Sequence, residues 1–218
     1  MKKSKAETAK TRQRIVEVAS EAIRNKGIYA TGVAEIMAAA GLTHGGFYRH
    51  FGSKEELVRE AIALSRKDFV AGTVAAADQG AEAILEHFQD YATAGYRDDI
   101  GGGCPLAANG SEIVRADAKT RHLATEGFRL ICDKAAPFMR PQNGATQQET
   151  AISVLTNMIG ALTIARMVDD PKLSDQILAV TRRRIANTID VPSPKPAELL
   201  AKQASKPHPT RARSKTQQ

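Results

Sequence analysis

The chain of 218 residues contains no tryptophan, and aromatic side chains make up only 5% of it. Alanine is abundant, and runs of β-branched residues are scarce. Small side chains of this kind favour closely packed helices over sheets. We therefore expect an all-α protein of one or two domains, because 42% of the residues are hydrophobic and can fill a core.

Only two cysteines are present, Cys104 and Cys132, which are too few for a disulfide framework. No signal-peptide pattern follows the basic first residues, and no unbroken apolar run has the length of a membrane span. The five histidines lack paired ligand spacing, and no phosphate loop, dinucleotide fingerprint or nucleophile elbow is present. We expect a cytoplasmic protein that is not an enzyme, has no metal or cofactor and binds no membrane.

Positive charge is concentrated at the two ends of the chain, although the formal net charge is only +7. Residues 1–14 contain six basic side chains and one acidic one, and so do residues 191–218. The N-terminal arm suits contact with DNA phosphates. The C-terminal segment is rich in Pro, Ser, Lys and Ala and lacks apolar periodicity, so we expect a disordered, solvated basic tail over 191–218.

Apolar residues recur at helical spacing along most of the remaining chain, which predicts about nine helices. Thr31 and Ser53 are placed to cap two of them, and Glu56 can complete a capping box with Ser53. Pro105 suits the first turn of another helix. The helices that we expect cover about 9–26, 32–40, 44–50, a stretch from 53, 80–96, a stretch from 105, 119–138, 146–168 and 172–190.

The segment 31–57 has the organisation of a helix-turn-helix. A helix over about 32–40 is followed by a tight turn at Gly41 and then by a short helix, the arrangement that places a reading helix in the DNA major groove. Gly45 and Gly46 lie inside this short helix, where each costs about 1 kcal/mol relative to Ala. We interpret them as positions where the backbone approaches the bases closely.

Phe47 and Phe51 are expected to face the core of this small unit, whereas Tyr48, Arg49 and His50 face outward and can meet phosphate oxygens. Taken singly, such polar residues are more often ordinary surface. Their order after a helix-turn pattern is what favours DNA contact. A lysine in the first turn of the next helix opposes the helix dipole unless a phosphate binds there, and Lys54 has this position.

The run Thr31-Gly-Val-Ala-Glu-Ile-Met-Ala-Ala-Ala-Gly-Leu-Thr-His-Gly-Gly-Phe-Tyr-Arg-His-Phe-Gly-Ser-Lys-Glu-Glu-Leu57 closely resembles the DNA-binding domain of TetR/AcrR-family regulators. The resemblance implies a three-helix DNA-binding domain over 1–58 and a helical ligand-binding and dimerisation domain over 59–190. It also implies a homodimer on a palindromic operator in double-stranded DNA, usually a repressor released by a small-molecule effector.

Position in the family motif assigns roles to single residues. The match implies base contacts from Thr43, His44 and Gly45 and phosphate contacts from Tyr48, His50 and Lys54, with Thr31 as a further phosphate contact. Gly46 and Arg49 fall at variable positions, so the match alone assigns them no fixed partner.

The stretch from Gly160 to Leu178 resembles the last two helices of one TetR subgroup, which pair with their symmetry mates in a four-helix bundle. The alternative is that their apolar faces serve only the intrachain core. We expect a homodimer, because a palindromic operator needs a two-fold protein. An effector pocket is expected among the helices of 59–158, although an aromatic stripe is more often core. Its candidate lining residues are Phe69, Phe88, Tyr91, Tyr96, Phe128, Phe138 and Met158.

Cys104 follows three glycines and precedes Pro105 at an expected helix start, where the helix dipole favours a thiolate. This context also resembles a segment of TetR relatives, some of which sense oxidants or electrophiles through such a cysteine. A repressor that senses through Cys104 is therefore one alternative, and a small buried hydrophobe is the other reading of this thiol; Cys132 is expected to be structural. An alternative of another class is a non-specific architectural DNA-binding protein, which would lack sequence preference.

Overall fold

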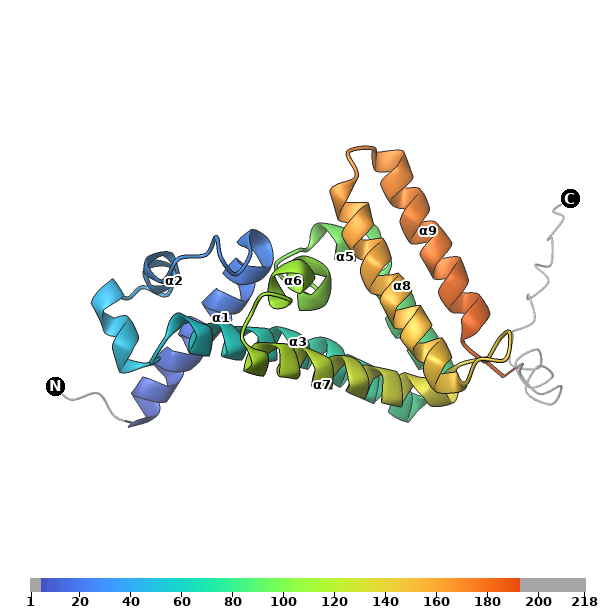
Figure 1. Cartoon of the computed structure of the whole chain (residues 1–218), viewed down its shortest axis with the longest axis horizontal. Coiled ribbons are helices and arrows are strands. Elements are labelled where there is room, and N and C mark those ends of the chain that lie inside the picture. The colour runs from blue at the N-terminus through green and yellow to red at the C-terminus, as the bar shows by residue number, and fades with distance from the viewer. Residues whose placement is uncertain (1–4, 193–218) are drawn as a thin grey trace, which may run out of the picture.

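The computed structural model describes residues 5–192, and over these residues it is built from nine α-helices and two 3-10 helices (Figure 1). This confirms the all-α prediction and the expected number of helices. The predicted C-terminal tail, apart from its first two residues, lies outside the described residues. The helices are α1 (Lys5–Lys26), α2 (Val33–Ala39), η1 (His44–Arg49), α3 (Lys54–Gln79), α4 (Ala81–Tyr91), α5 (Ala94–Asp98), α6 (Pro105–Ile113), α7 (Ala118–Ala135), η2 (Ala136–Phe138), α8 (Gln147–Met167) and α9 (Pro171–Thr188).

The buried side chains form two hydrophobic clusters. The first cluster joins α1, α2, η1 and the beginning of α3. The second joins α4, α7, α8, α9 and the far end of α3. Two helices contribute to both: α3 places Leu57 in the first and Ala76 in the second, and α6 places Ile113 in the first and Ala107 in the second.

The two clusters lie at opposite ends of an elongated molecule (Figure 1). α1, α2 and η1 form one end, and the antiparallel hairpin of α8 and α9 forms the other. Between them α3 and α7 pack side by side over most of their length. α3, α7 and the short helix α6 therefore connect the two ends of the molecule.

Several helix ends follow from local signals. Pro105 opens α6 and Asp170 caps α9, where its carboxylate accepts hydrogen bonds from the backbone N–H groups of Lys172 and Leu173. The Ser53 hydroxyl accepts from Glu56 N at 3.2 Å. The Glu56 carboxylate, however, accepts from Gly52 N at 2.7 Å and not from Ser53, so the predicted capping box forms only in part.

Two predicted helices differ in extent from those observed. The prediction of one continuous helix over 80–96 is wrong, because α4 ends at Tyr91 and a separate helix α5 begins after Thr93. The Thr93 hydroxyl caps α5 by accepting a hydrogen bond from Tyr96 N. The helix expected over 119–138 changes to 3-10 geometry after Ala135, where Pro137 removes a backbone donor.

Among the described helices, α8 alone is long and apolar enough, by length and composition, to cross a membrane. The sequence shows no unbroken apolar run there, because Gln, Thr, Ser and Asn interrupt the helix. Its Val154, Leu155, Met158 and Leu162 side chains are buried in the second cluster. This burial is what a core helix of a folded domain displays.

Candidate DNA-binding interface

The turn between α2 and η1 is a Schellman motif built on Gly41. The N–H of Gly41 donates to Ala38 O at 2.9 Å and the N–H of Leu42 donates to Met37 O at 2.8 Å. Gly41 has φ +68°, a left-handed conformation that glycine adopts without the strain of a Cβ. This geometry ends α2 sharply and sends the chain into η1, so the predicted helix-turn-helix is present, with a 3-10 helix as its second member.

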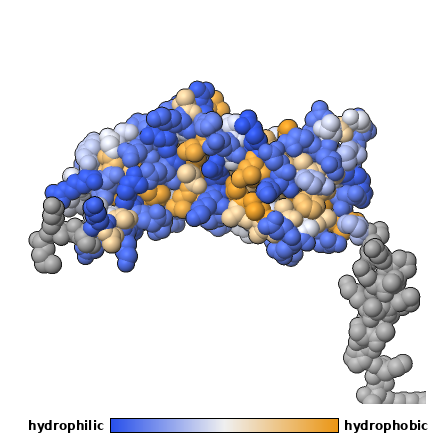
Figure 2. Space-filling model, turned by 90° about the horizontal axis from the view of Figure 1, so that it is seen from below, coloured by the Kyte–Doolittle hydropathy of each residue, from blue (hydrophilic) through white to orange (hydrophobic). Residues whose placement is uncertain are grey.

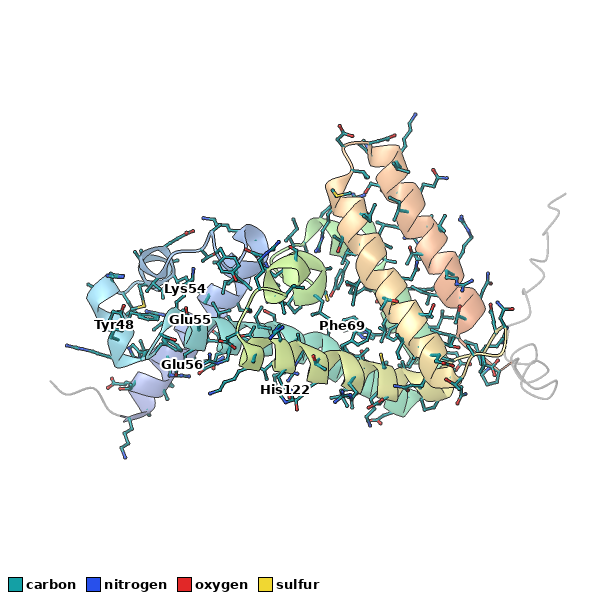
Figure 3. All side chains as sticks on the ribbon, viewed as in Figure 1. Tyr48, Lys54, Glu55, Glu56, Phe69 and His122 are labelled. Carbon is teal, nitrogen blue, oxygen red and sulfur yellow. The ribbon has the colours of Figure 1, made fainter. Side chains whose placement is uncertain are left out.

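Two phenylalanines fix the orientation of η1. Phe47 and Phe51 are 1% and 2% exposed, and their ring centroids lie 5.6 Å apart within the first cluster. Because they face inward, the intervening Tyr48 faces outward and is 73% exposed. Figure 3 shows Tyr48 at the outer edge of the molecule. It lies far from Phe69, which packs against the second cluster.

All of the predicted DNA-contact residues except Thr31 lie together on this face, on η1 or directly beside it. Lys54 is in the first turn of α3, next to η1 (Figure 3). The exposed residues are Thr43, His44, Gly45, Tyr48 and Arg49, and the partly exposed ones are Gly46, His50 and Lys54.

The protein itself has no need for glycine at Gly45 or Gly46. A Cβ added to Gly45 would meet no atom within 4 Å, and one added to Gly46 would lie 3.6 Å from Met37 Cε, an ordinary contact. Neither residue has a positive φ. Neither space nor backbone conformation therefore requires glycine at these two positions.

Thr31 does not belong to this face. Its side chain is completely buried, and its hydroxyl donates to Gly27 O at 2.7 Å. The residue that caps α2 is Gly32. The predictions that Thr31 caps a helix and that its side chain contacts DNA are therefore wrong; it holds the turn between α1 and α2 instead.

The contacts that Arg12 and Arg14 make within the protein could not be predicted from the sequence. Arg12 Nε donates to His50 O at 3.1 Å, its guanidinium pairs with Glu56 and Glu60, and it lies 4.4 Å over the Phe51 ring. Arg14 donates to Ala40 O. Both arginines thus tie α1 to the helix-turn-helix, and the charge of Arg12 is paired with Glu56 and Glu60.

A second set of contacts joins this unit to α6. The Glu112 carboxylate accepts from Ile28 N at 2.8 Å and Tyr29 N at 3.2 Å, directly after Gly27. A Cβ on Gly27 would lie 2.7 Å from that carboxylate, so glycine makes the contact possible. Asn109 Nδ2 donates to Ile23 O at 2.9 Å. α6 thereby holds the turn that leads into α2.

The candidate effector residues occupy two kinds of position in the second cluster. Phe88, Tyr91 and Met158 are buried core side chains, whereas Phe69, Tyr96, Phe128 and Phe138 are partly buried and pack against that core. A small hollow of about 20 Å³ is lined by Phe69, Phe128 and Cys104, together with Leu106 and Ile131.

Cys104 lies at the N-cap of α6, as the sequence predicts, and is only 6% exposed. Cys132 lies in the middle of α7 and is 1% exposed. Burial raises the pKa of the Cys132 thiol to about 11, so this thiol stays protonated at neutral pH.

Comparison with known proteins identifies the family that the helix-turn-helix region matches. The family model described as "Bacterial regulatory proteins, tetR family" matches residues 15–61, which span α1, the helix-turn-helix and the start of α3. The HTH-type transcriptional regulator AcrR of Shigella flexneri is 39% identical over 67 residues, 31% of this chain and 31% of AcrR. Residues 15–61 thus match the N-terminal region of TetR-family regulators.

Similarity to known regulators is strongest in the same region. The HTH-type transcriptional repressor BepR of Brucella suis is 33% identical over 66 residues, 30% of this chain and 32% of BepR. These matches thus span less than a third of either relative's length. The crystal structure of the reduced form of Escherichia coli NemR superposes with a TM-score of 0.72 at 17% identity, covering 85% of this chain and all of that one, which establishes the shared fold.

The buried position of Thr31 leads to a first prediction. In the Thr31→Val variant, loss of the hydrogen bond to Gly27 O should lower the free energy of unfolding by about 1 kcal/mol. DNA affinity should stay unchanged under conditions where the variant is folded. Urea denaturation and fluorescence anisotropy with labelled DNA measure the two effects. Unchanged stability together with weakened DNA binding would restore Thr31 to the interface.

Proposed function

We propose that this protein is a TetR-family, sequence-specific transcriptional repressor, a homodimer that a small-molecule effector releases from a palindromic operator. We assign DNA binding to residues 1–58 and effector binding and dimerisation to residues 59–190. The observation that carries the proposal is the outward face of η1. It combines an exposed tyrosine, held there by the buried Phe47 and Phe51, with glycines that nothing inside the protein requires.

The face divides naturally into base-reading and phosphate-binding parts. Thr43, His44 and Gly45 lie at the N-terminus of η1. In a helix-turn-helix, this end of the second helix contacts base edges in the major groove. Tyr48 and Lys54 lie farther along, where a hydroxyl and an ammonium suit phosphate oxygens. Lys54 also stands at the N-terminus of α3, whose backbone N–H groups attract an anion.

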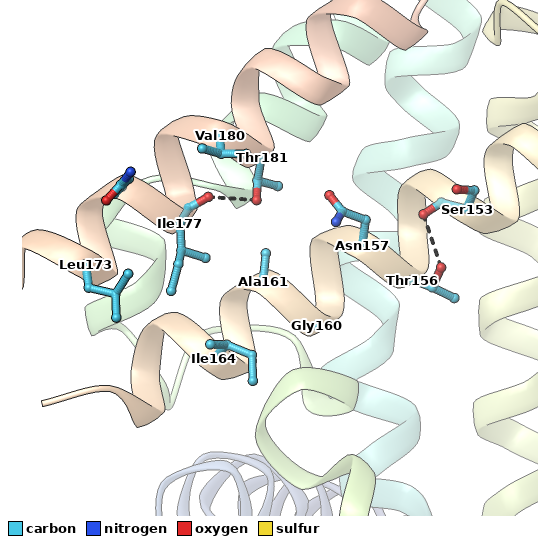
Figure 4. Close-up of a pocket in the computed structure, with 11 residues that line it drawn as sticks. Ser153, Thr156, Asn157, Gly160, Ala161, Ile164, Leu173, Ile177, Val180 and Thr181 are labelled. Atoms are coloured by element: carbon cyan, nitrogen blue, oxygen red, sulfur yellow. Dashed lines mark hydrogen bonds between the residues drawn. The ribbon is translucent and has the colours of Figure 1, made fainter. Parts of the chain in front are cut away.

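Dimerisation is supported by the exposed side of the α8–α9 hairpin. A groove of about 820 Å³ lies between these helices, bordered by Gly160, Ile164, Leu173 and Val180 (Figure 4). The last three side chains are 41–49% exposed although apolar. A Cβ at Gly160 would meet no atom within 4 Å, so a second helix can approach closely there. Seen from below, the surface also displays apolar side chains among polar ones (Figure 2).

Effector response is supported by the two ends of α6. Its N-terminal end, at Cys104 and Leu106, lines the small hollow in the second domain. Its C-terminal part, through Asn109 and Glu112, holds the turn at the end of α1. A ligand that enlarges the hollow must displace this short helix, and the displacement then reaches the reading head. The ligand shifts the equilibrium between the DNA-bound and the released arrangement only as far as it binds one of them more tightly than the other.

A second candidate mechanism, sensing through Cys104, is favoured by the position of the thiol at the hinge of that same helix. An adduct on a 6% exposed sulfur cannot be accommodated without movement of α6. The chemistry would be alkylation or oxidation of the thiol, with release of DNA as the result.

The phosphate assignments predict a specific salt response. Lys54→Ala should weaken binding to operator and random DNA alike and lower the slope of log affinity against log salt by about 1, because one released counterion is lost. Tyr48→Phe should weaken both without changing the slope, since it removes no charge. Lys67→Ala, an exposed lysine farther along α3, is the matched control. Native slope and affinity in Lys54→Ala would refute the assignment.

The Cys104 mechanism predicts that N-ethylmaleimide releases operator DNA from the native protein and from Cys132→Ser, but not from Cys104→Ser. Cys132 is the control because its buried thiol, with a pKa of about 11, stays protonated and poorly reactive. Anisotropy titration with mass spectrometry of the labelled peptide gives both readouts. Release that persists in Cys104→Ser, or labelled Cys104 without release, would contradict this mechanism and leave the pocket-binding repressor.

A further inference from the structure

Arg166 of α8 is a half-buried cation that forms no ion pair in the part of the chain that the structure describes. Its Nε donates to Arg97 O at 2.9 Å and its Nη2 donates to Tyr96 O at 3.0 Å, both neutral backbone carbonyls at the end of α5. Within residues 5–192, no carboxylate forms an ion pair with it. Burial lowers the pKa of Arg166, but a guanidinium stays charged in proteins. Its direct hydrogen-bond acceptors are therefore backbone carbonyls, and Asp99 acts on it only at longer range.

A second polar group lies beside it without a partner. Tyr91 is 1% exposed, and its hydroxyl has no hydrogen-bond partner among the described residues. Arg166 Nη1 is likewise buried and unpartnered. Burial, followed by the neighbouring Cys104, raises the pKa of Tyr91, so its hydroxyl keeps its proton. The Tyr91 hydroxyl and Arg166 Nη1 are thus buried hydrogen-bond donors without an acceptor among the described residues.

The local backbone is shaped around this cluster. A Cβ on Gly103 would lie 3.0 Å from Arg166 Nη2, so glycine allows the guanidinium to lie against the loop that leads to Cys104. Cys104 also lines the apolar hollow, and Phe69 on the hollow's wall packs edge-on against Tyr91 with ring centroids 5.3 Å apart. Cys104 therefore lies between the two donors, which do not line the hollow themselves, and the apolar hollow.

We infer that Arg166 and Tyr91, beside Cys104, form the polar end of the effector site, and that the effector is a carboxylate with an apolar body. A planar guanidinium pairs with a carboxylate through charge-assisted hydrogen bonds. The apolar body would enter the hollow beside Phe69, Phe128 and Ile131, which must widen to admit it. This inference rests on the proposed function, which supplies the role of the ligand.

The test uses the full-length protein and three probe pairs at neutral pH: benzoate, phenylacetate and hexanoate, each against its neutral amide. Thermal unfolding and isothermal titration calorimetry report binding. The carboxylates should raise the unfolding temperature at millimolar concentration and bind at least about tenfold more tightly than the amides, because only they compensate the charge of Arg166.

Two variants locate the site. Tyr91→Phe should unfold without ligand at the same temperature as the native protein or higher, because it removes an unpartnered hydroxyl, yet bind carboxylates about tenfold more weakly. Arg166→Lys keeps the charge and loses the planar fork, so it should still prefer carboxylates but bind them less tightly. Tyr29→Phe, whose ring is 58% exposed, is the control and should change nothing.

Equal effects of carboxylates and amides would overturn the inference, as would no stabilisation by any carboxylate or native affinity in both variants. Operator binding, measured on the same preparations, separates this inference from the proposed function. If the protein binds its operator and ignores the carboxylates, the repressor proposal stands and the inference fails. If it binds carboxylates in a Tyr91-dependent way but no operator, the site stands and the proposed repressor fails.

Discussion

Continuity of α3 is the constraint on which the rest of the structure depends. Its first turns place Leu57 and Ile62 in the cluster that supports the helix-turn-helix, and its last turns place Ala76 in the cluster of the second domain. One unbroken helix thus connects the helix-turn-helix to the second cluster, beside which the effector is proposed to bind. α6 adds a shorter connection, because its Asn109 and Glu112 side chains form hydrogen bonds with the end of α1 and the turn after it.

Local chemistry made much of the fold predictable. Gly41 and Pro105 act within a few residues of themselves, and the helix ends that they predict are observed. The break between α4 and α5 has no such signal in its apolar pattern, which continues through Tyr91 and Tyr96. The burial of Thr31 also escaped prediction, because a threonine before a helix reads as a cap unless the course of α1 beneath it is known.

The same distinction applies to the functional residues. The exposed face of η1 could be predicted, since the Phe47 and Phe51 spacing alone decides which way Tyr48 points. Arg12, Glu112 and Arg166 could not, because their partners lie 38, 84 and 69 residues away in sequence. Their roles become visible only when α1, α6 and α8 are brought against the rest of the fold. The DNA-contact and effector roles themselves remain predictions.

Selection of bound sequences from random double-stranded DNA by the full-length protein tests the central claim most directly. The account predicts an enriched inverted repeat whose half-sites lie one helical turn, or a multiple of it, apart, because two reading heads are related by a two-fold axis. Binding to this repeat should exceed binding to random DNA by at least about a thousandfold. No enriched sequence, or an enriched sequence without a repeat, would contradict a dimeric, sequence-specific regulator.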